Sequence, residues 1–336
     1  MHTMTVSDNK GNRRQLAEML AQGGEGSVYP LSNRADVLVK IYHADKLAEM
    51  GNSQRQKIEA MSLKKDKFAN LNICWPLLSV FDEQQRYIGY AMKKAQGVPM
   101  SYLAHALAYQ KHFPNLDRVS IVKYLLSYLS TIELLHDKGV MIGDYNLNNF
   151  LCDLNREQVI FIDCDSYQVT VDGNYYACPV CLPEFSPPEN HGKYFSQVIL
   201  TPESEAFSIA IVLFQCLMLG RYPYDVIGGE DRVSSLKKGN FAYGIGARGI
   251  PKGAWYNIWS HMPSRLKGMF IQVFKEGAAD VSQRPSIKEW KHSLEIYLNE
   301  LNKGWHNTEI KPAKPKEDAY RGQCTLGSRS SSRNRV

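Results

Sequence analysis

The first third of the chain alternates short apolar runs with turn residues. A glycine-rich turn at residues 23–26 precedes a β-branched run at 37–41, and two further apolar segments lie around 75–81 and 87–92. Runs of β-branched and aromatic residues bounded by glycine, proline and polar residues are typical of strands. We therefore predict a β-sheet in this part of the chain.

The polar stretch at residues 45–67 interrupts these strand-like segments. Its apolar residues Ile58, Met61 and Leu63 recur at roughly helical intervals. This spacing predicts one helix beside the sheet, with the three side chains directed inward.

Long helices dominate the chain from residue 119 onward. Apolar residues recur every three or four positions over 119–136, and Gly139 is a suitable helix end. Short strands are expected around Phe150 and Phe161. Further helical stretches lie at 204–219, 264–276 and 286–301.

These elements predict an α+β fold with two lobes. An antiparallel β-sheet N-lobe with one main helix is expected over residues 15–94, and a mainly α-helical C-lobe over 95–302, with the hinge near 93–97. Residues 1–14 are expected to be an N-terminal extension. Residues 303–336 are rich in basic residues and end in a Ser/Arg run, which predicts a disordered tail beyond Trp305.

Composition and charge narrow the range of functions. Apolar residues make up 44% of the 336 residues, which excludes an intrinsically disordered chain. The net charge is +6, but residues 303–336 contain eight basic and three acidic side chains, so +5 of it lies in the tail and +1 in the rest. Nucleic-acid binding is therefore expected only through the tail, if at all.

The seven cysteines are odd in number and scattered, unlike a secreted disulfide framework. No apolar run reaches the ~18 residues that a membrane helix needs, and the first residues lack the apolar core of a signal peptide. We therefore expect a cytoplasmic protein that does not associate with membranes. Cys178 and Cys181 form a CxxC pair, but one pair supplies only two zinc ligands, so coincidence is favoured over a metal or redox site.

The glycine-rich turn and the strand after it are the first candidates for chemistry. Glycines let backbone N–H groups approach phosphate oxygens because no Cβ intervenes. A dinucleotide-binding fingerprint would continue into a helix, whereas here an apolar strand follows and supplies Lys40. A buried lysine needs a counter-ion or an anionic ligand. Glu59 on the predicted helix is the first candidate partner, and Glu49 is the second.

A cluster of oxygen-bearing side chains is the strongest signal. Asp144 and Asn149 lie in a short loop that leads into an apolar strand, and Asp163 ends the next strand. Carboxylate and amide oxygens at neighbouring strand ends are suited to Mg²⁺ with bound phosphates. Asp and Asn also occupy ordinary turns, but the whole arrangement favours a metal site.

In their order and spacing these motifs resemble the signature set of the protein kinase fold over residues 15–300. The segments GDYNLNNFL, FIDCDSYQV and PEFSPPE are similar to those of bacterial atypical Ser/Thr protein kinases. Some members of this group carry helix-hairpin-helix domains, and others are associated with von Willebrand A proteins and PP2C-type phosphatases in tellurite-resistance systems. The motif positions are 23–28, Lys40, Glu59, 144–149, Asp163, 185–189 and 284–286.

The resemblance implies ATP and Mg²⁺ as cofactors and gives roles to matching residues. Asp144 would orient or deprotonate the attacking hydroxyl, and Asn149 and Asp163 would hold Mg²⁺. Lys40, braced by Glu59, would neutralise the α and β phosphates. The other implied nucleotide-binding residues are Gly23, Gly24, Gly26, Val28, Met92, Lys93 and Ala95.

Several positions depart from the family pattern. Ile-Gly at 142–143 replaces His-Arg, so activity is not expected to depend on phosphorylation of the activation segment. Asn146 replaces the lysine that contacts the γ-phosphate, which predicts a slow enzyme or one that borrows a basic group. Cys-Asp at 164–165 replaces Phe-Gly and offers a second carboxylate near the metal. Glu205 replaces the aspartate that anchors the catalytic loop, and its longer side chain is able to do the same.

The resemblance implies transfer of phosphate from ATP to Ser/Thr hydroxyls of a protein substrate in a bacterial signalling or stress-response system. A von Willebrand A protein and a PP2C-type phosphatase are implied partners. Two alternatives stay open: a small-molecule phosphotransferase of the aminoglycoside or choline kinase type, and a nucleotide-binding pseudokinase scaffold. An expected Glu189–Arg284 pair, which would hold the activation segment, favours a protein substrate. Autophosphorylation is expected at the tail hydroxyls Thr325, Ser328, Ser330, Ser331 and Ser332.

Overall fold

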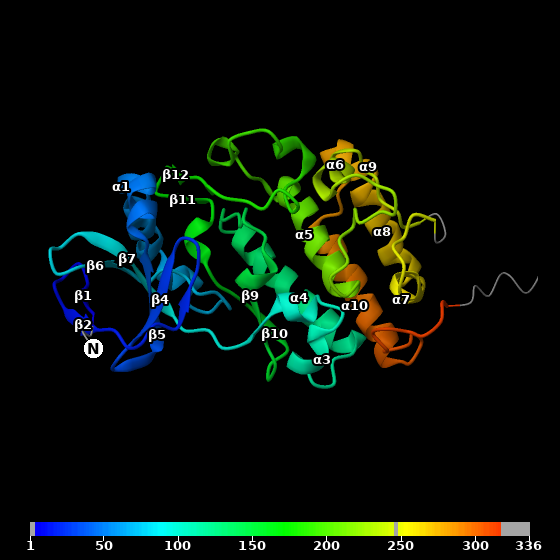
Figure 1. Cartoon of the computed structure of the whole chain (residues 1–336), viewed down its shortest axis with the longest axis horizontal. Coiled ribbons are helices and arrows are strands. Elements are labelled where there is room, and N and C mark those ends of the chain that lie inside the picture. The colour runs from blue at the N-terminus through cyan, green and yellow to red at the C-terminus, as the bar shows by residue number, and fades with distance from the viewer. Residues whose placement is uncertain (1–3, 245–247, 317–336) are drawn as a thin grey trace, which may run out of the picture.

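A computed structural model describes residues 4–244 and 248–316. A β-sheet and one long helix form one end of the molecule, and helices form the other (Figure 1). The predicted α+β, two-lobed fold is therefore confirmed.

The N-lobe sheet is antiparallel in every pair, with strand order β2-β1-β6-β7-β5-β4-β3. Its strands are β1 (Thr5–Ser7), β2 (Arg13–Gln15), β3 (Ala21–Gln22), β4 (Gly26–Leu31), β5 (Arg34–Tyr42), β6 (Leu78–Phe81) and β7 (Tyr87–Lys93). Because β1 pairs with both β2 and β6, five of the first 14 residues belong to the sheet: Thr5–Ser7, Arg13 and Arg14. The segment predicted as an N-terminal extension therefore adds strands to the N-lobe sheet, which the sequence did not indicate because strands of three residues are too short to show an alternating pattern.

Strand β5 has two different faces because successive side chains alternate across a sheet. Val37 and Val39 join a small cluster on the outer face, whereas Leu38, Lys40 and Tyr42 face the C-lobe. The sheet therefore directs Lys40 into the space between the lobes.

Helix α1 (Ala44–Leu63) covers the sheet on the C-lobe side and is broken at Gly51, where φ is +59°. Its second half buries Ile58 and Met61, as predicted. Leu63, which we expected to be inward, is 75% exposed because it follows Met61 by only two residues and lies on the outer side.

The C-lobe is built around α4 (Arg118–His136) and α5 (Pro202–Leu217), close to the predicted bounds. Thr201 and Ser204 form a capping box that begins α5, and Phe214 on this helix lies in an aromatic core. The other helices are α2 (Met100–Leu103), α3 (Ala108–His112), α6 (Arg232–Lys237), α7 (Trp255–His261), α8 (Ser264–Phe274), α9 (Glu276–Ala279) and α10 (Ile287–Asn302).

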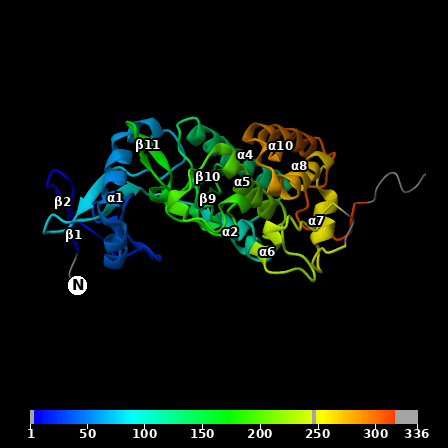
Figure 2. The ribbon, with the colours of Figure 1, turned by 90° about the horizontal axis from the view of Figure 1, so that it is seen from above.

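Short strands and 3₁₀ turns connect the helices and the main sheet. Strands β8 (Val98–Pro99), β9 (Phe150–Asp153) and β10 (Gln158–Phe161) form one sheet, and β11 (Val169–Val171) pairs with β12 (Asn174–Tyr176). The turned view places β11 beside α1 (Figure 2). The 3₁₀ turns are η1 (Lys65–Phe68), η2 (Leu147–Asn149), η3 (Cys164–Ser166), η4 (Pro188–Asn190), η5 (Phe195–Gln197) and η6 (Val281–Gln283).

The chain after Trp305 packs on the C-lobe up to residue 316. Buried Arg118 donates from Nε to the Glu309 carbonyl at 2.9 Å, and Ile310 is 5% exposed. Asn257 donates to the carbonyls of residues 312 and 313. Our prediction of disorder beyond Trp305 was therefore wrong for residues 306–316, because the side chains that fix this segment lie far away in the sequence. The tail hydroxyls expected to accept phosphate lie outside the described residues.

Candidate active site

The glycine-rich turn between β3 and β4 lies over the space between the lobes. The N–H of Gly23 donates to the Gly26 carbonyl at 2.8 Å, and the His43 N–H donates to the Glu25 carbonyl at 2.8 Å. A Cβ on Gly26 would lie 2.4 Å from the Ile41 carbonyl oxygen, so glycine is required there. A Cβ on Gly24 would meet nothing within 4 Å, and one on Gly23 would meet the Gly26 carbonyl oxygen at 3.9 Å.

Lys40 is 5% exposed and contacts three carboxylates. Its Nζ lies 2.6 Å from Asp163 Oδ1, 3.0 Å from Asp165 Oδ2 and 3.3 Å from Glu25 Oε2. Although burial lowers the pKa of the lysine, the carboxylates outweigh it and raise the pKa above its usual value. Lys40 is therefore charged, and it lies at the site that the sequence predicts for phosphates.

Neither predicted helix partner of Lys40 is in place. Glu59 pairs instead with Arg55 and Glu49 with Lys46, each at 2.8 Å. The bracing of Lys40 by Glu59 was therefore a wrong prediction. After the break at Gly51, α1 turns a different set of residues toward the core: Gln54, Lys57, Ile58 and Met61.

Asp165 replaces the predicted helix partner. Its side chain is 2% exposed and accepts hydrogen bonds from the hydroxyls of Tyr42 at 2.7 Å and Tyr90 at 2.9 Å, besides the ion pair with Lys40. Burial favours the neutral acid, but Lys40 and the donors lower the pKa of Asp165 to about 2. Gln54 of α1 donates to the Tyr42 hydroxyl at 2.8 Å. Sequence reasoning missed these partners, except for Asp165, which it placed near the metal.

Asp144 and Asn149 are held together in the loop before β9. Asn149 Nδ2 donates to Asp144 Oδ2 at 3.2 Å, and the Asn149 carbonyl accepts from the Ile162 N–H at 2.9 Å, which brings the loop next to Asp163. Burial raises the pKa of Asp144. Asp163 has a positive φ of +60°, a conformation that Asp tolerates better than most residues. The three predicted oxygen donors therefore lie on adjoining segments.

Glu205 anchors this loop, as predicted. Its Oε1 accepts from the Gly143 N–H at 2.6 Å, and its Oε2 lies 2.7 Å from His136 Nε2. Gly143 has φ +71°, and a Cβ there would lie 2.6 Å from Cys178 Sγ. The glycine that departs from the family pattern is thus required by close packing against the segment of residues 164–189.

The sheet register places the predicted adenine-binding residues along one edge of the site. Met92 is opposite Leu38, Tyr90 is opposite Lys40, and Val28 is also opposite Lys40 on the other neighbouring strand. Met92 is therefore on the same sheet face as Lys40, since the two are related by an even register. Lys93 and Ala95 follow at the hinge, where Lys93 is exposed and donates to the Ala69 carbonyl at 3.3 Å.

The expected Glu189–Arg284 pair is present. Both guanidinium nitrogens, Nη1 and Nη2, lie 2.7 Å from a carboxylate oxygen of Glu189, and Nε donates to the Gly277 carbonyl at 2.8 Å. Cys178 and Cys181 are free thiols. Within the described ranges, no three His, Cys, Asp or Glu side chains gather in a way that suits a metal ion, which gives the CxxC pair no support as a zinc site.

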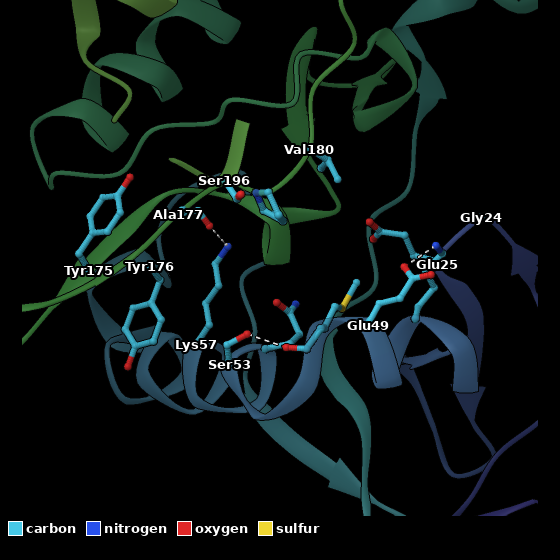
Figure 3. Close-up of a pocket in the computed structure, with 14 residues that line it drawn as sticks. Gly24, Glu25, Glu49, Ser53, Lys57, Tyr175, Tyr176, Ala177, Val180 and Ser196 are labelled. Carbon is cyan, nitrogen blue, oxygen red and sulfur yellow. Dashed lines mark hydrogen bonds and ion pairs between the residues drawn. The ribbon is translucent and has the colours of Figure 1, made fainter. Parts of the chain in front are cut away.

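A cleft of about 790 Å³ separates α1 from the segment of residues 175–180 (Figure 3). Lys57 crosses it and donates to the Ala177 carbonyl at 3.1 Å. Burial lowers the pKa of Lys57 to about 8. Glu25 at the tip of the glycine-rich turn lines the end of the cleft, so the cleft adjoins the site around Lys40.

The residues present fit a nucleotide phosphate group with Mg²⁺. Asn149 uses its amide nitrogen for Asp144, which leaves its amide oxygen as a ligand, and the Asp163 side chain is 40% exposed. An oxygen donor set of this kind is what Mg²⁺ prefers. Lys40 supplies the fixed positive charge.

No protein-family model matches the chain. Its sequence is similar to that of protein kinase YegI from Escherichia coli K12, with 26% identity over 308 residues, or 89% of this chain and 47% of that protein. For YegI of strain O157:H7 the identity is 26% over 294 residues, 84% of this chain and 45% of that protein. The chain spans about half the length of these curated relatives.

A rhoptry kinase from Toxoplasma gondii has a similar structure, with a TM-score of 0.61 and 13% identity, covering 91% of this chain and 86% of that chain. The fold is protein-kinase-like. The sequence likeness is thus to proteins named as protein kinases, and the structural likeness is one of fold. Of the helices in the described part of the chain, none has the length and apolar character needed to cross a membrane.

Proposed function

We propose that this protein transfers phosphate from ATP, with Mg²⁺, to Ser/Thr hydroxyls of a protein substrate. The observation that carries the proposal is one continuous set of contacts: Lys40 lies 2.6 Å from Asp163, and Asp144 and Asn149 lie on the adjoining loop, 3.2 Å apart. Cation, metal ligands and a carboxylate base are the parts that phosphoryl transfer requires.

Each residue has a defined task in this proposal. Lys40 exchanges Glu25 for phosphate oxygens, since Glu25 is its most distant carboxylate at 3.3 Å. Asn149 and Asp163 hold Mg²⁺, which would neutralise charge on the phosphates when bound. Asp144 accepts a hydrogen bond from the acceptor hydroxyl and takes its proton as the new O–P bond forms.

A protein acceptor is favoured over a small molecule by the ion pair between Glu189 and the buried Arg284. This pair fixes the end of the 164–189 segment to the C-lobe, with the Arg284 side chain only 1% exposed. A firmly held segment beside the site suits the docking of an extended peptide. The implied von Willebrand A and PP2C-type partners and a cytoplasmic location rest on the sequence resemblance alone and are part of the proposal.

A pseudokinase scaffold is the second candidate function. The observation that favours it is Asn146, whose side chain accepts from the Asn148 N–H at 3.0 Å and supplies no positive charge where kinases place a lysine. Against it stands the joint placement of Lys40, Asp144, Asn149 and Asp163.

The experiment measures transfer of ³²P from [γ-³²P]ATP to casein, to the protein itself and to a panel of aminoglycosides and choline, with and without Mg²⁺. We expect Mg²⁺-dependent label on protein, lost in Asp163→Asn and kept in the control Asp172→Asn, an exposed aspartate paired with Lys64. Label only on a small acceptor would replace the proposal by a small-molecule kinase. Nucleotide binding without transfer to any acceptor would replace it by a scaffold.

A further inference from the structure

Helix α1 presents an uncharged residue toward the catalytic lysine. Gln54 is 7% exposed and donates from Nε2 to the Tyr42 hydroxyl at 2.8 Å. Glu49 and Glu59 of the helix pair with Lys46 and Arg55 of the same helix. A buried ammonium group requires a counter-ion. The counter-ion of Lys40 must therefore come from outside α1.

Asp165 satisfies this requirement with both carboxylate oxygens. Oδ1 accepts from Lys40 at 3.1 Å and from Tyr90 at 2.9 Å, and Oδ2 accepts from Lys40 at 3.0 Å and from Tyr42 at 2.7 Å. Because four short contacts use both oxygens and the side chain is 2% exposed, Asp165 is not placed to bind a metal. Asp163, in contrast, is 40% exposed and gives only Oδ1 to Lys40.

We infer that Asp165 is the positioning residue that keeps Lys40 in place when Mg²⁺ takes up the carboxylate of Asp163, and that Tyr42 and Gln54 connect this contact to helix α1. The inference rests on the proposed function, in which Asp163 binds Mg²⁺. When nucleotide and Mg²⁺ bind, phosphate oxygens replace Glu25 at Lys40, and the Asp163 carboxylate binds the metal. Asp165 alone stays with the lysine throughout.

Loss of Asp165 should change the Mg²⁺ concentration that nucleotide binding needs. Without the charge of Asp165, the nearest remaining partner of Lys40 is Asp163, already at 2.6 Å. The ammonium group then competes with Mg²⁺ for that carboxylate. Loss of Asp165 therefore raises the Mg²⁺ concentration that nucleotide binding needs, whereas the removal of a negative charge by itself would strengthen the binding of an anionic nucleotide.

The test titrates Mg²⁺ against the full chain with a fluorescent ADP analogue, which reports nucleotide binding without catalysis. In Asp165→Asn we expect the Mg²⁺ concentration for half-maximal binding to rise at least fivefold and the transfer rate to fall at least tenfold. Tyr42→Phe keeps the charges of Lys40 and Asp165 and should raise the Mg²⁺ concentration for half-maximal binding by about two- to threefold. The matched control is Tyr224→Phe, which removes a buried hydroxyl bonded to the Phe274 carbonyl at 2.9 Å in the C-lobe and should shift nothing.

An unchanged or lower Mg²⁺ requirement in folded Asp165→Asn overturns the inference. If Asp165→Asn does not fold, the same result in Tyr42→Phe overturns it. If the wild-type protein transfers no phosphate but the Mg²⁺ shifts are found, the proposed function fails while the positioning role of Asp165 stands.

Discussion

Lys57 is a buried lysine whose replacement should stabilise the protein. It is 3% exposed, lies on the core side of α1 and donates to the Ala177 carbonyl at 3.1 Å. Among the residues that the structure describes, no carboxylate forms an ion pair with it. Burial lowers the pKa of its ammonium group from 10.5 to about 8, so the charged lysine is destabilised in the folded state.

The size of the effect follows from these values. Since one pKa unit corresponds to about 1.4 kcal/mol, burying the charged lysine costs about 3 kcal/mol at pH 7. Lys57→Met removes this cost but loses a hydrogen bond of about 1 kcal/mol. We expect the free energy of unfolding to rise by about 2 kcal/mol at pH 7.

The stability advantage of Lys57→Met should depend on pH. The folded-state pKa lies below the unfolded one, so the unfolded chain binds more protons between pH 8 and 10.5, and the stability of the wild-type protein gains over this range. The advantage of Lys57→Met is complete below pH 8 and should shrink by about 2 kcal/mol between pH 7 and 9.5.

The assay is urea unfolding of the wild-type protein and Lys57→Met at pH 7 and 9.5. Lys46→Met is the control, because Lys46 lies on the same helix but is 33% exposed and paired with Glu49. It should show no such change with pH. A Lys57→Met protein that is less stable than wild type at pH 7, or whose advantage does not depend on pH, would refute the reasoning.

Three further predictions concern stability. Glu189→Gln leaves the buried Arg284 guanidinium without its carboxylate and should lower the free energy of unfolding by about 3 kcal/mol in urea; a loss below about 1 kcal/mol would contradict this. Gly143→Ala combines a positive φ with a Cβ 2.6 Å from Cys178 Sγ, so it should lower the melting temperature, and adding Cys178→Ala should restore part of it; no recovery would count against this contact. A chain ending at residue 305 lacks the carbonyl partners of Arg118 and should melt at a lower temperature than the full chain, and equal melting temperatures would show that this packing contributes nothing.

The sequence predicted the elements with strong periodicity and the residues set by local motifs. Helices α4, α5, α8 and α10 lie within a few residues of their predicted bounds, because their apolar faces repeat over several turns. The pairing of Asp144 with Asn149 lies within one loop, which local spacing can anticipate.

Contacts that depend on orientation or on distant segments were not predictable in this way. The break at Gly51 changes which face of α1 is buried, so spacing alone selected Glu59 where the structure buries Gln54. The pairing of Lys40 with Asp165 joins residues 125 positions apart. Its one sequence signal was the extra aspartate after Asp163.

The most direct test of the central claim is single-turnover transfer from [γ-³²P]ATP by Asp144→Asn, with nucleotide affinity measured on the same sample. Asp144 contacts Asn149 and is not among the carboxylates on Lys40, so its loss should leave nucleotide binding within about threefold of wild type. We predict that the rate of transfer falls at least 100-fold, as expected for the loss of a general base. Transfer at the wild-type rate in Asp144→Asn would contradict the assignment of this site as the phosphotransfer centre.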